Sequence, residues 1–280
     1  MEAVELAYDV YESSNANSNL PPIIFLHGLF WNKFVYRGLV RKLGQATNRK
    51  IYSLDLRNHG ESPFCEDCDI YLMCEDVKRF MKERNLHRVT FVCHSFSSTI
   101  AYLIALEKPD AVEKLVLVDQ LPFLDFQAES AHLQVNVQNR ILGILDPAMS
   151  LGCARAKLLQ LAEMGTTGQK WFYKKAAYDL TKVDEQFKWR TDFNFLLNKY
   201  LQRAFTPKPV GHSEHEILIV RCPNSISVPD SKFAAALRHN PNAMLVTLED
   251  TTHILILEKL DKFVEVVKEF LDEKNNRTEK

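Results

Sequence analysis

Short apolar segments alternate with segments of helical spacing along most of this chain. A run of about four to eight residues rich in Val, Ile, Leu and Phe is typical of a strand that is buried on both faces. Such strands separated by helices predict an α/β fold, with a mostly parallel central sheet flanked by helices. The expected buried strands are Ile23–Leu26, Ile51–Leu54, Val89–Cys93, Lys114–Val118, Glu216–Val220 and Met244–Leu248.

The segments that flank these strands have other periodicities. Val4–Tyr11 alternates apolar and polar residues, which predicts an antiparallel edge strand. Apolar residues three and four positions apart predict helices elsewhere. The expected helices are Phe34–Leu43, Asp69–Glu83, Thr99–Leu106, 231–239 and Lys259–Leu271.

One long interval breaks the alternation. Between Val118 and Glu216 we find no convincing strand, and the helical stretches there are Leu133–Leu145, Ala154–Met164, Lys170–Leu180 and Phe193–Phe205. A helical insertion between two strands, at the carboxyl edge of a sheet, predicts a lid over an active-site crevice. The aromatic residues of the interval could equally serve the core of the lid itself. We therefore expect a core formed by residues 1–120 and 215–280, and a helical lid formed by residues 121–214.

Composition excludes several classes of function. The chain has 280 residues, which can form one large α/β domain or two modest ones, and its 46% of hydrophobic residues can bury a sizeable core. Its 35 basic and 36 acidic residues nearly cancel, so no charge field favours a nucleic-acid partner. The segment starting at Met1 resembles no signal or transit peptide, and no apolar run reaches the roughly 18 residues of a transmembrane helix. We expect a cytoplasmic protein, and the sequence leaves its oligomeric state open.

Three of the six cysteines lie close together in the sequence. Cys65 and Cys68 have the C-x-x-C spacing of a zinc site, and Cys74 could add a third thiolate. No second pair of this kind lies nearby, and a cytoplasmic chain of this size needs no disulfide. We expect reduced thiols, no metal and no other cofactor.

The segment Val92–Ser98 contains a candidate nucleophile. Ser95 lies between an expected strand and the helix that follows it, which is the position of a nucleophile elbow. The sharp turn brings the residues two before and two after the serine close together, so both must be small. Here they are Cys93 and Ser97 instead of the usual glycines. We expect extra strain or a slight shift of the backbone at this turn.

A serine becomes a good nucleophile when a base removes its proton and an acid orients that base. In sheets that carry such an elbow, the acid and then the histidine follow the serine along the chain. His253 follows the last expected strand and is therefore the expected base. The alternative is an ordinary histidine of a surface loop.

Two positions could supply the acid. Asp119 directly follows the strand Lys114–Val118, so its carboxylate should emerge at the edge where the imidazole is expected. The other position, after the next strand, holds Ser225, which cannot act as an acid. We favour Asp119, although it could instead cap a turn, and Asp230 is the alternative acid.

The transition state of acyl transfer needs two backbone N–H donors, which form an oxyanion hole. We expect these donors to be Phe96, at the start of the helix after Ser95, and Leu29. Gly28 should permit the turn before Leu29, and His27 is expected to brace this loop. Three aromatic residues are expected to line an apolar pocket for the acyl group: Phe30, Trp31 and Phe123.

Several ordered motifs resemble the α/β-hydrolase superfamily, and more narrowly its branch of short-chain acyl esterases and abhydrolase-domain esterases. The motifs are Phe25-Leu-His-Gly-Leu29, Asp55-Leu-Arg-Asn-His-Gly-Glu-Ser62, Val118-Asp-Gln-Leu-Pro122, and Trp189-Arg190 followed by Asn194. The resemblance extends from about residue 3 to residue 271. Some members of the branch use the aspartate of the V-D-x-x-P segment as their acid, which supports Asp119. Thr251 and Thr252 replace glycines that often precede the family's histidine.

The resemblance implies a serine hydrolase that cleaves carboxylic esters or thioesters of small apolar acyl groups. Ser95 would act as nucleophile, His253 as base and Asp119 as acid. Cofactor-free peroxidases of related fold use a similar triad, whereas related enzymes with an aspartate nucleophile are excluded by Ser95. The alternative is a weakened or inactive hydrolase-fold protein that binds an apolar ligand under the lid.

Overall fold

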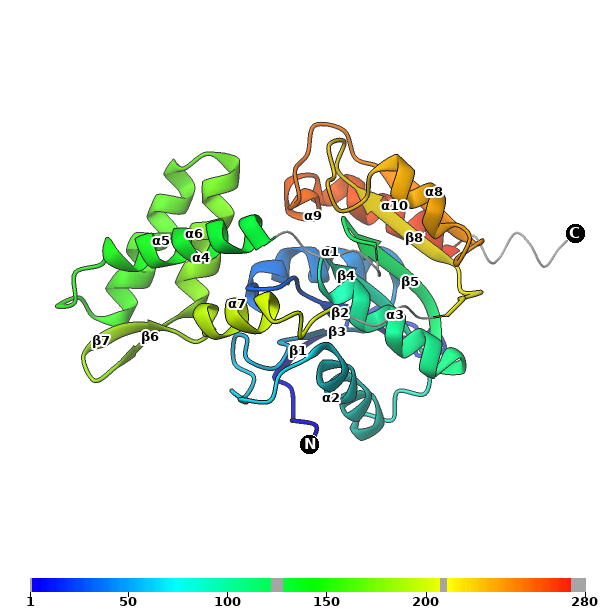
Figure 1. Ribbon diagram of the computed structural model, residues 1–280, viewed down its shortest axis with the longest axis horizontal. Coiled ribbons are helices and arrows are strands. Elements are labelled where there is room, and N and C mark those ends of the chain that lie inside the picture. The colour runs from blue at the N-terminus through cyan, green and yellow to red at the C-terminus, as the bar shows by residue number, and fades with distance from the viewer. Residues whose placement is uncertain (1, 122–127, 207–210, 273–280) are drawn as a thin grey trace, which may run out of the picture.

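A seven-stranded sheet forms the centre of the protein (Figure 1). The computed structural model describes residues 2–121, 128–206 and 211–272. The strands are β1 (Tyr8–Tyr11), β2 (Ile23–Leu26), β3 (Ile51–Leu54), β4 (Val89–His94), β5 (Val112–Val118), β8 (Ile217–Arg221) and β9 (Ala243–Thr247), in the order β1-β3-β2-β4-β5-β8-β9. Only β1 is antiparallel to its neighbour. This confirms the predicted sheet, with an edge strand shorter than expected.

Alternate residues of the strands pack against helices on opposite faces of the sheet. On β2, Ile24 and Leu26 belong to one hydrophobic cluster, and Ile23 and Phe25 belong to the other. The first face is covered by α2 (Ile70–Glu83), α3 (Ser97–Glu107) and α8 (Asp230–Ala236), and the second by α1 (Arg37–Thr47), α9 (Leu255–Glu258) and α10 (Leu260–Asp272). Short 3₁₀ helices, η1 (Lys33–Tyr36) and η2 (Pro109–Ala111), precede α1 and β5. Burial on both faces explains why the strands are continuous apolar runs.

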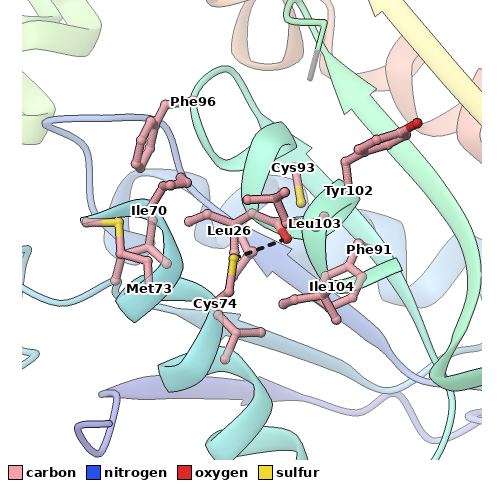
Figure 2. Close-up of a cluster of buried hydrophobic side chains, with 14 of the residues drawn as sticks. Leu26, Ile70, Met73, Cys74, Phe91, Cys93, Phe96, Tyr102, Leu103 and Ile104 are labelled. Carbon is pink, nitrogen blue, oxygen red and sulfur yellow. Dashed lines mark hydrogen bonds between the residues drawn. The ribbon is translucent and has the colours of Figure 1, made fainter. Parts of the chain in front are cut away.

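Helix α3 is buried on nearly all sides. Ile100, Tyr102 and Ile104 are completely buried, and Figure 2 shows α3 packed between α2 and sheet residues such as Phe91. The thiol of Cys74 on α2 donates to the carbonyl oxygen of Ile100 at 3.7 Å. A helix packed in this way has little freedom to shift. The residues at its N-terminus, directly after β4, therefore have a fixed position.

The interval between β5 and β8 contains four helices and one hairpin among its described residues. They are α4 (Ala128–Gly143), α5 (Leu151–Met164), α6 (Thr167–Asp179), β6 (Leu180–Val183), β7 (Gln186–Trp189) and α7 (Phe193–Leu201). Helices α4, α5 and α6 share a hydrophobic cluster, whereas α7 and the first half of α4, with Ala131 and Val135, pack in the main core. Figure 1 shows this insertion beside the sheet, next to the carboxyl ends of the strands. No described helix is both long and apolar enough to cross a bilayer.

The hairpin β6–β7 corrects the sequence analysis, which expected no strand in this interval and placed Leu180 at the end of a helix. Each strand has only four residues, and the two strands pair antiparallel. Asp184 and Glu185 form the turn with φ angles of 50° and 59°. Such turns usually carry Asn-Gly or Asp-Gly. Asp-Glu is not a recognised turn signal, so the sequence pattern did not predict the hairpin.

A buried ion pair anchors the loop that follows β3. Arg57 Nε lies 2.5 Å from Asp76 Oδ2, and Arg57 Nη2 lies 2.6 Å from Asp76 Oδ1. Both side chains are about 1% exposed. The Val4 N–H also donates to Asp76 Oδ1, at 2.7 Å. The pair therefore joins the N-terminal segment, α2 and the loop.

Replacing Arg57 by methionine should lower the free energy of unfolding by about 3–5 kcal/mol, because Asp76 would remain buried without its partner. Urea unfolding followed by circular dichroism measures the change. Lys262→Met, which breaks an exposed pair with Glu265, is the control and should leave the unfolding midpoint almost unchanged. Equal midpoints for the two variants would contradict the role assigned to Arg57.

Candidate active site

Three polar side chains meet at the carboxyl edge of the sheet. Ser95 directly follows β4, Asp119 directly follows β5, and His253 lies in the loop between β9 and α9. Ser95 Oγ lies 2.9 Å from His253 Nε2, and His253 Nδ1 lies 2.7 Å from Asp119 Oδ2. With Nδ1 protonated, the imidazole donates to the carboxylate and accepts from the hydroxyl. The structure thus brings together the three residues that the sequence predicted as nucleophile, base and acid.

Two of these residues have left-handed backbone conformations. The φ angles are 57° at Ser95 and 51° at Asp119, where residues other than glycine are rarely found. The Ser95 N–H donates to Val118 O at 2.7 Å, and the Asp119 N–H donates to Val220 O at 2.8 Å. Backbone hydrogen bonds to the neighbouring strands therefore hold both strained residues in place.

The elbow accommodates Cys93 and Ser97 in place of the usual glycines. Both side chains are completely buried. The Ser97 hydroxyl is within hydrogen-bond distance of two carbonyl oxygens, Leu26 O at 2.9 Å and His94 O at 3.1 Å. The extra polar atom therefore has partners, and it connects the elbow to the end of β2.

The surroundings of Asp119 favour its charged form. Burial alone would raise the pKa of this carboxyl, but hydrogen bonding and charge from His253 outweigh burial, so the pKa is lowered. The Cys222 N–H donates to Oδ1 at 3.0 Å, and the Ser225 hydroxyl lowers the pKa further. The alternative acid, Asp230, is exposed and pairs instead with Arg221 at 2.6 Å.

Of the expected oxyanion donors, Phe96 directly follows Ser95, and Leu29 directly follows Gly28 on the loop after β2. No described group accepts a hydrogen bond from either backbone N–H. The N–H of Phe30, by contrast, donates to His59 Nε2 at 3.1 Å. Gly28 permits a close approach between this loop and the elbow, because an added Cβ would lie 3.2 Å from the His94 ring and 3.4 Å from Ser95 Cβ.

Two buried neutral histidines brace the loop around Leu29. His27 Nδ1–H donates to Gly28 O at 2.8 Å, and Nε2 accepts from the Leu56 N–H at 3.0 Å. His59 Nδ1–H donates to Arg57 O at 2.8 Å, while its Nε2 accepts from Phe30 as described. Burial lowers the pKa of each ring to about 3, so both remain neutral. His27 was expected in this role, whereas the sequence analysis assigned none to His59.

A third buried histidine holds the loop of His253. The Tyr36 hydroxyl donates to His94 Nδ1 at 2.8 Å, and His94 Nε2–H donates to the backbone oxygen of His253 at 2.9 Å. Burial lowers the pKa of His94 to about 3. The sequence analysis missed this contact, because only the position of His94 beside Ser95 could have pointed to it.

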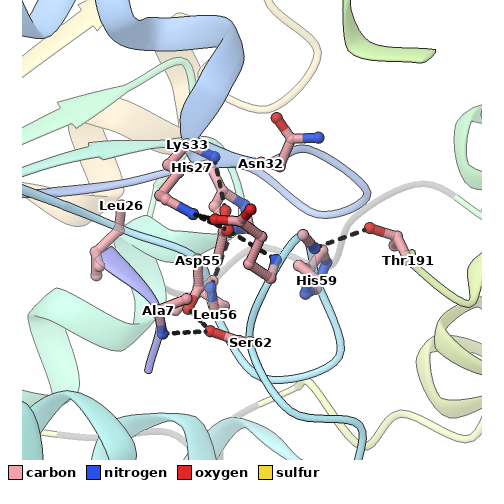
Figure 3. A network of polar contacts seen from close by, with 12 residues as sticks. Ala7, Leu26, His27, Asn32, Lys33, Asp55, Leu56, His59, Ser62 and Thr191 are labelled. Carbon is pink, nitrogen blue, oxygen red and sulfur yellow. Dashed lines mark hydrogen bonds and ion pairs between the residues drawn. The ribbon is translucent and has the colours of Figure 1, made fainter. Parts of the chain in front are cut away.

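A network centred on Asp55 joins the loops after β2 and β3 (Figure 3). The backbone N–H and the ammonium of Lys33 both donate to Asp55 at 2.7 Å. The Gly60 N–H in turn donates to the hydroxyl of Thr191, which belongs to the insertion, at 3.2 Å. Gly60 has a φ of 54° and leaves no room for a Cβ beside Asp55. The motif from Asp55 to Ser62 therefore supports the site through its hydrogen bonds.

A cleft of about 540 Å³ opens beside His253. Trp31 and Phe172 contribute aromatic rings to it, and two largely exposed apolar side chains, Leu133 and Ile226, also line it. Phe30, also expected in the pocket, is fully buried, and its ring centroid lies 5.9 Å from that of Phe193. The third expected pocket residue, Phe123, lies outside the described residues.

The cysteines and threonines singled out by the sequence have structural contacts. Burial raises the pKa of Cys68 to about 12 and also raises that of Cys74, which opposes the thiolate form that zinc requires. In the described ranges, no three potential metal ligands come together. The Thr251 hydroxyl donates to Leu248 O at 2.6 Å, and Thr252 bonds to Glu258, so the loop before His253 is held without glycines.

Comparisons with known proteins agree with this architecture. A family model described as the alpha/beta hydrolase fold matches residues 21–148. The sn-1-specific diacylglycerol lipase ABHD11 of Mus musculus is 27% identical over 262 residues, which cover 93% of this chain and 84% of that protein. An abhydrolase domain-containing protein of Schizosaccharomyces pombe is 27% identical, covering 97% of this chain and 99% of its own. A solved marine microorganism esterase has a TM-score of 0.76 at 22% identity, covering 96% of this chain and 100% of its own.

This chain has the α/β-hydrolase fold. The predicted fold is therefore confirmed, and the similarity to abhydrolase-domain proteins extends over nearly the whole chain. In this fold, three neutral histidines hold the loops that carry the candidate site residues.

The neutral state of these histidines should make stability depend on pH. In the unfolded chain a histidine binds a proton below about pH 6.5, whereas His27, His59 and His94 in the folded protein stay neutral down to about pH 3. The unfolded state therefore binds more protons in this window, and stability falls as the pH falls. Each histidine contributes about 1.4 kcal/mol per pH unit well below pH 6.5.

Urea unfolding between pH 7 and pH 5 measures this dependence. His59→Gln, whose amide can replace both hydrogen bonds, should reduce the slope by about 1.4 kcal/mol per pH unit near pH 5. The exposed residue His87 provides the control, because His87→Gln should keep the slope of the unmodified protein. Identical slopes in all three proteins would contradict the neutral assignment of His59.

Proposed function

We propose that this α/β hydrolase is a serine hydrolase that cleaves carboxylic esters or thioesters through an acyl-enzyme. The hydrogen-bonded series of Ser95, His253 and Asp119 at the carboxyl edge of the sheet carries this proposal. Such a series supplies a nucleophile, a general base and a group that orients the base. The names of several relatives and structural neighbours, which include lipase, esterase and thioesterase, support the same class of substrate.

The first half of the reaction forms the acyl-enzyme. Ser95 Oγ attacks the acyl carbonyl carbon while His253 Nε2 accepts the hydroxyl proton. The N–H groups of Leu29 and Phe96 donate to the oxygen that becomes negatively charged, and the dipole of α3 favours the same charge. Asp119 stabilises the imidazolium. When the tetrahedral intermediate collapses, His253 gives its proton to the departing alcohol or thiol.

Water completes the reaction. His253 removes a proton from a water molecule, whose oxygen attacks the acyl carbon, and the second tetrahedral intermediate releases the carboxylic acid and Ser95. Only the chain's own groups transfer protons in this scheme. Each attack requires that Nε2 of His253 be free to accept a proton.

A fluorophosphonate probe tests the nucleophile, because it bonds covalently to activated serines. Intact protein should gain one adduct, which peptide mass mapping locates on Ser95, and Ser95→Ala should gain none. Ser14→Ala, at an exposed turn, is the control and should label like the unmodified protein. Folded protein without an adduct and without turnover of any ester would favour the apolar-ligand binding protein.

Replacing the proposed acid should lower activity strongly. Asp119→Asn should reduce kcat by about 10⁴-fold, because the imidazole loses its favoured tautomer and its counter-charge. Initial rates with p-nitrophenyl esters of increasing chain length measure the effect and the depth of the pocket together. Asp230→Asn is the matched control and should change kcat by less than about twofold. Mild and equal losses in both variants would mean that neither aspartate is the acid.

A further inference from the structure

A lysine that forms no ion pair with any described residue lies buried between the insertion and the candidate active site. Lys175 on α6 is 0% exposed, and its ammonium has no hydrogen-bond partner among the described residues. Its Nζ lies 4.6 Å from the ring centroid of Phe193 and 5.5 Å from that of Trp31. The two ring faces offset only part of the cost of burying an ammonium. Burial accordingly lowers the pKa of Lys175.

Two more unpaired donors lie in the same region. The indole N–H of Trp189 is buried without an acceptor, and its ring centroid is 6.1 Å from that of Phe193. Gln138 on α4 is 0% exposed, and neither atom of its amide has a partner. An ammonium and an indole N–H are donors only, and an amide supplies two further N–H bonds. Unpaired N–H donors therefore outnumber unpaired acceptors in this region, where the free acceptors are the amide oxygens of Gln138 and Asn32.

The neighbours of Gln138 place it near Lys175. Helix α4, which carries Gln138, packs against both α6 and α7, and Val135, about one turn before Gln138, belongs to the main hydrophobic cluster. Ile141, about one turn after it, packs in the cluster that contains Ala176 of α6. Residues three apart on a helix share a face. Gln138 therefore faces the junction of α6 and α7, where the Lys175 ammonium lies.

This group of donors adjoins the loop that carries Leu29. The Phe193 ring packs against Phe30, with centroids 5.9 Å apart, and Trp31 contacts Lys175 on one side. On the other side, Trp31 lines the cleft that contains His253. The rings of Phe30 and Trp31 thus connect these donors to the loop of Leu29 and to the cleft beside His253. A short acyl chain on Ser95 reaches the donors by passing beside these rings.

The nearest negative charge already has its own partners. Asp179, one turn after Lys175 on α6, accepts from the hydroxyl of Thr191 at 2.8 Å and from its N–H at 3.2 Å. The Asn32 amide lies 3.5 Å from the same carboxylate. Asp179 moderates the charge of Lys175 at longer range but forms no hydrogen bond with it. The ammonium remains available for an incoming group.

We propose that Lys175, Gln138 and Trp189 form a subsite for a carboxylate at the far end of the acyl group. The preferred substrates would then be half-esters or half-thioesters of short dicarboxylic acids, a conclusion that rests on the proposed hydrolase function. A carboxylate offers two oxygens with several lone pairs, which matches three donor groups that lack acceptors. An uncharged alkyl end would leave those donors buried and unpaired.

The experiment compares matched pairs of substrates. Monoethyl succinate, glutarate and adipate are each paired with the ethyl ester in which an isopropyl group replaces the carboxylate. The ratio of kcat/KM within a pair reports recognition of the charge and is independent of the absolute rate. In the unmodified protein, the half-ester of the best-fitting length should exceed its neutral partner by about 10-fold or more.

Lys175→Met replaces the ammonium by an apolar side chain of similar length and should lower this ratio by about 10- to 100-fold. Gln138→Leu should lower the ratio by several fold, and it tests the subsite if Lys175→Met does not fold. Lys174→Met is the matched control, because Lys174 is the adjacent lysine of α6 and lies over the Trp171 ring. Its ratio should equal that of the unmodified protein.

Two outcomes would overturn the subsite, namely a ratio near one for every chain length, or an unchanged ratio in both Lys175→Met and Gln138→Leu. Neither outcome affects the proposed hydrolase function if Ser95 still reacts with the fluorophosphonate. Calorimetric binding of the half-esters covers the opposite case. If Ser95 is unreactive, binding of a half-ester that is lost in Lys175→Met would support the subsite and not the hydrolase.

Discussion

The parallel pairing of β4, β5 and β8 determines where the polar groups of the site lie. His94 pairs with Val118, and Val118 pairs with Val220, so these strands end side by side. Ser95, the residue after β4, donates its N–H to Val118 O. Asp119, the residue after β5, donates its N–H to Val220 O. Ser95 and Asp119 are therefore held by the same ladder of hydrogen bonds that builds the sheet. A shift of register by one residue would separate the serine from the acid.

The loops around this edge are held by buried polar side chains rather than by apolar contacts alone. Each of the three neutral histidines offers one donor and one acceptor, and each connects two parts of the chain that are distant in the sequence. Such connections have directions, so they fix the orientation of a loop as well as its position. The cost is that every member must remain paired and uncharged. The site thus combines rigidity with sensitivity to protonation.

The sequence predicted the candidate site residues whose positions depend on strand order. It did not predict the side-chain contacts that depend on tertiary packing. Ser95, Asp119 and His253 could be predicted because each follows a recognisable strand, and strand ends of one edge converge. The contacts of His94 with Tyr36 and with the backbone of His253 join residues 58 and 159 positions apart, and no local pattern specifies them. A sequence also cannot predict that Lys175 is unpaired. That state depends on how α4, α6, α7 and the hairpin β6–β7 pack together.

The elbow without glycines has a thermodynamic consequence. A glycine allows the unfolded chain more backbone conformations than another residue does, and folding must overcome that entropy. Neither Cys93 nor Ser97 has a positive φ, so neither position requires glycine for its conformation. At compatible positions, replacing glycine stabilises a protein by about 0.4–1 kcal/mol through the unfolded state. The chain has only 9 glycines in 280 residues, whereas glycine makes up about 7% of average proteins. Its unfolded state therefore has comparatively few backbone conformations, and folding loses less conformational entropy.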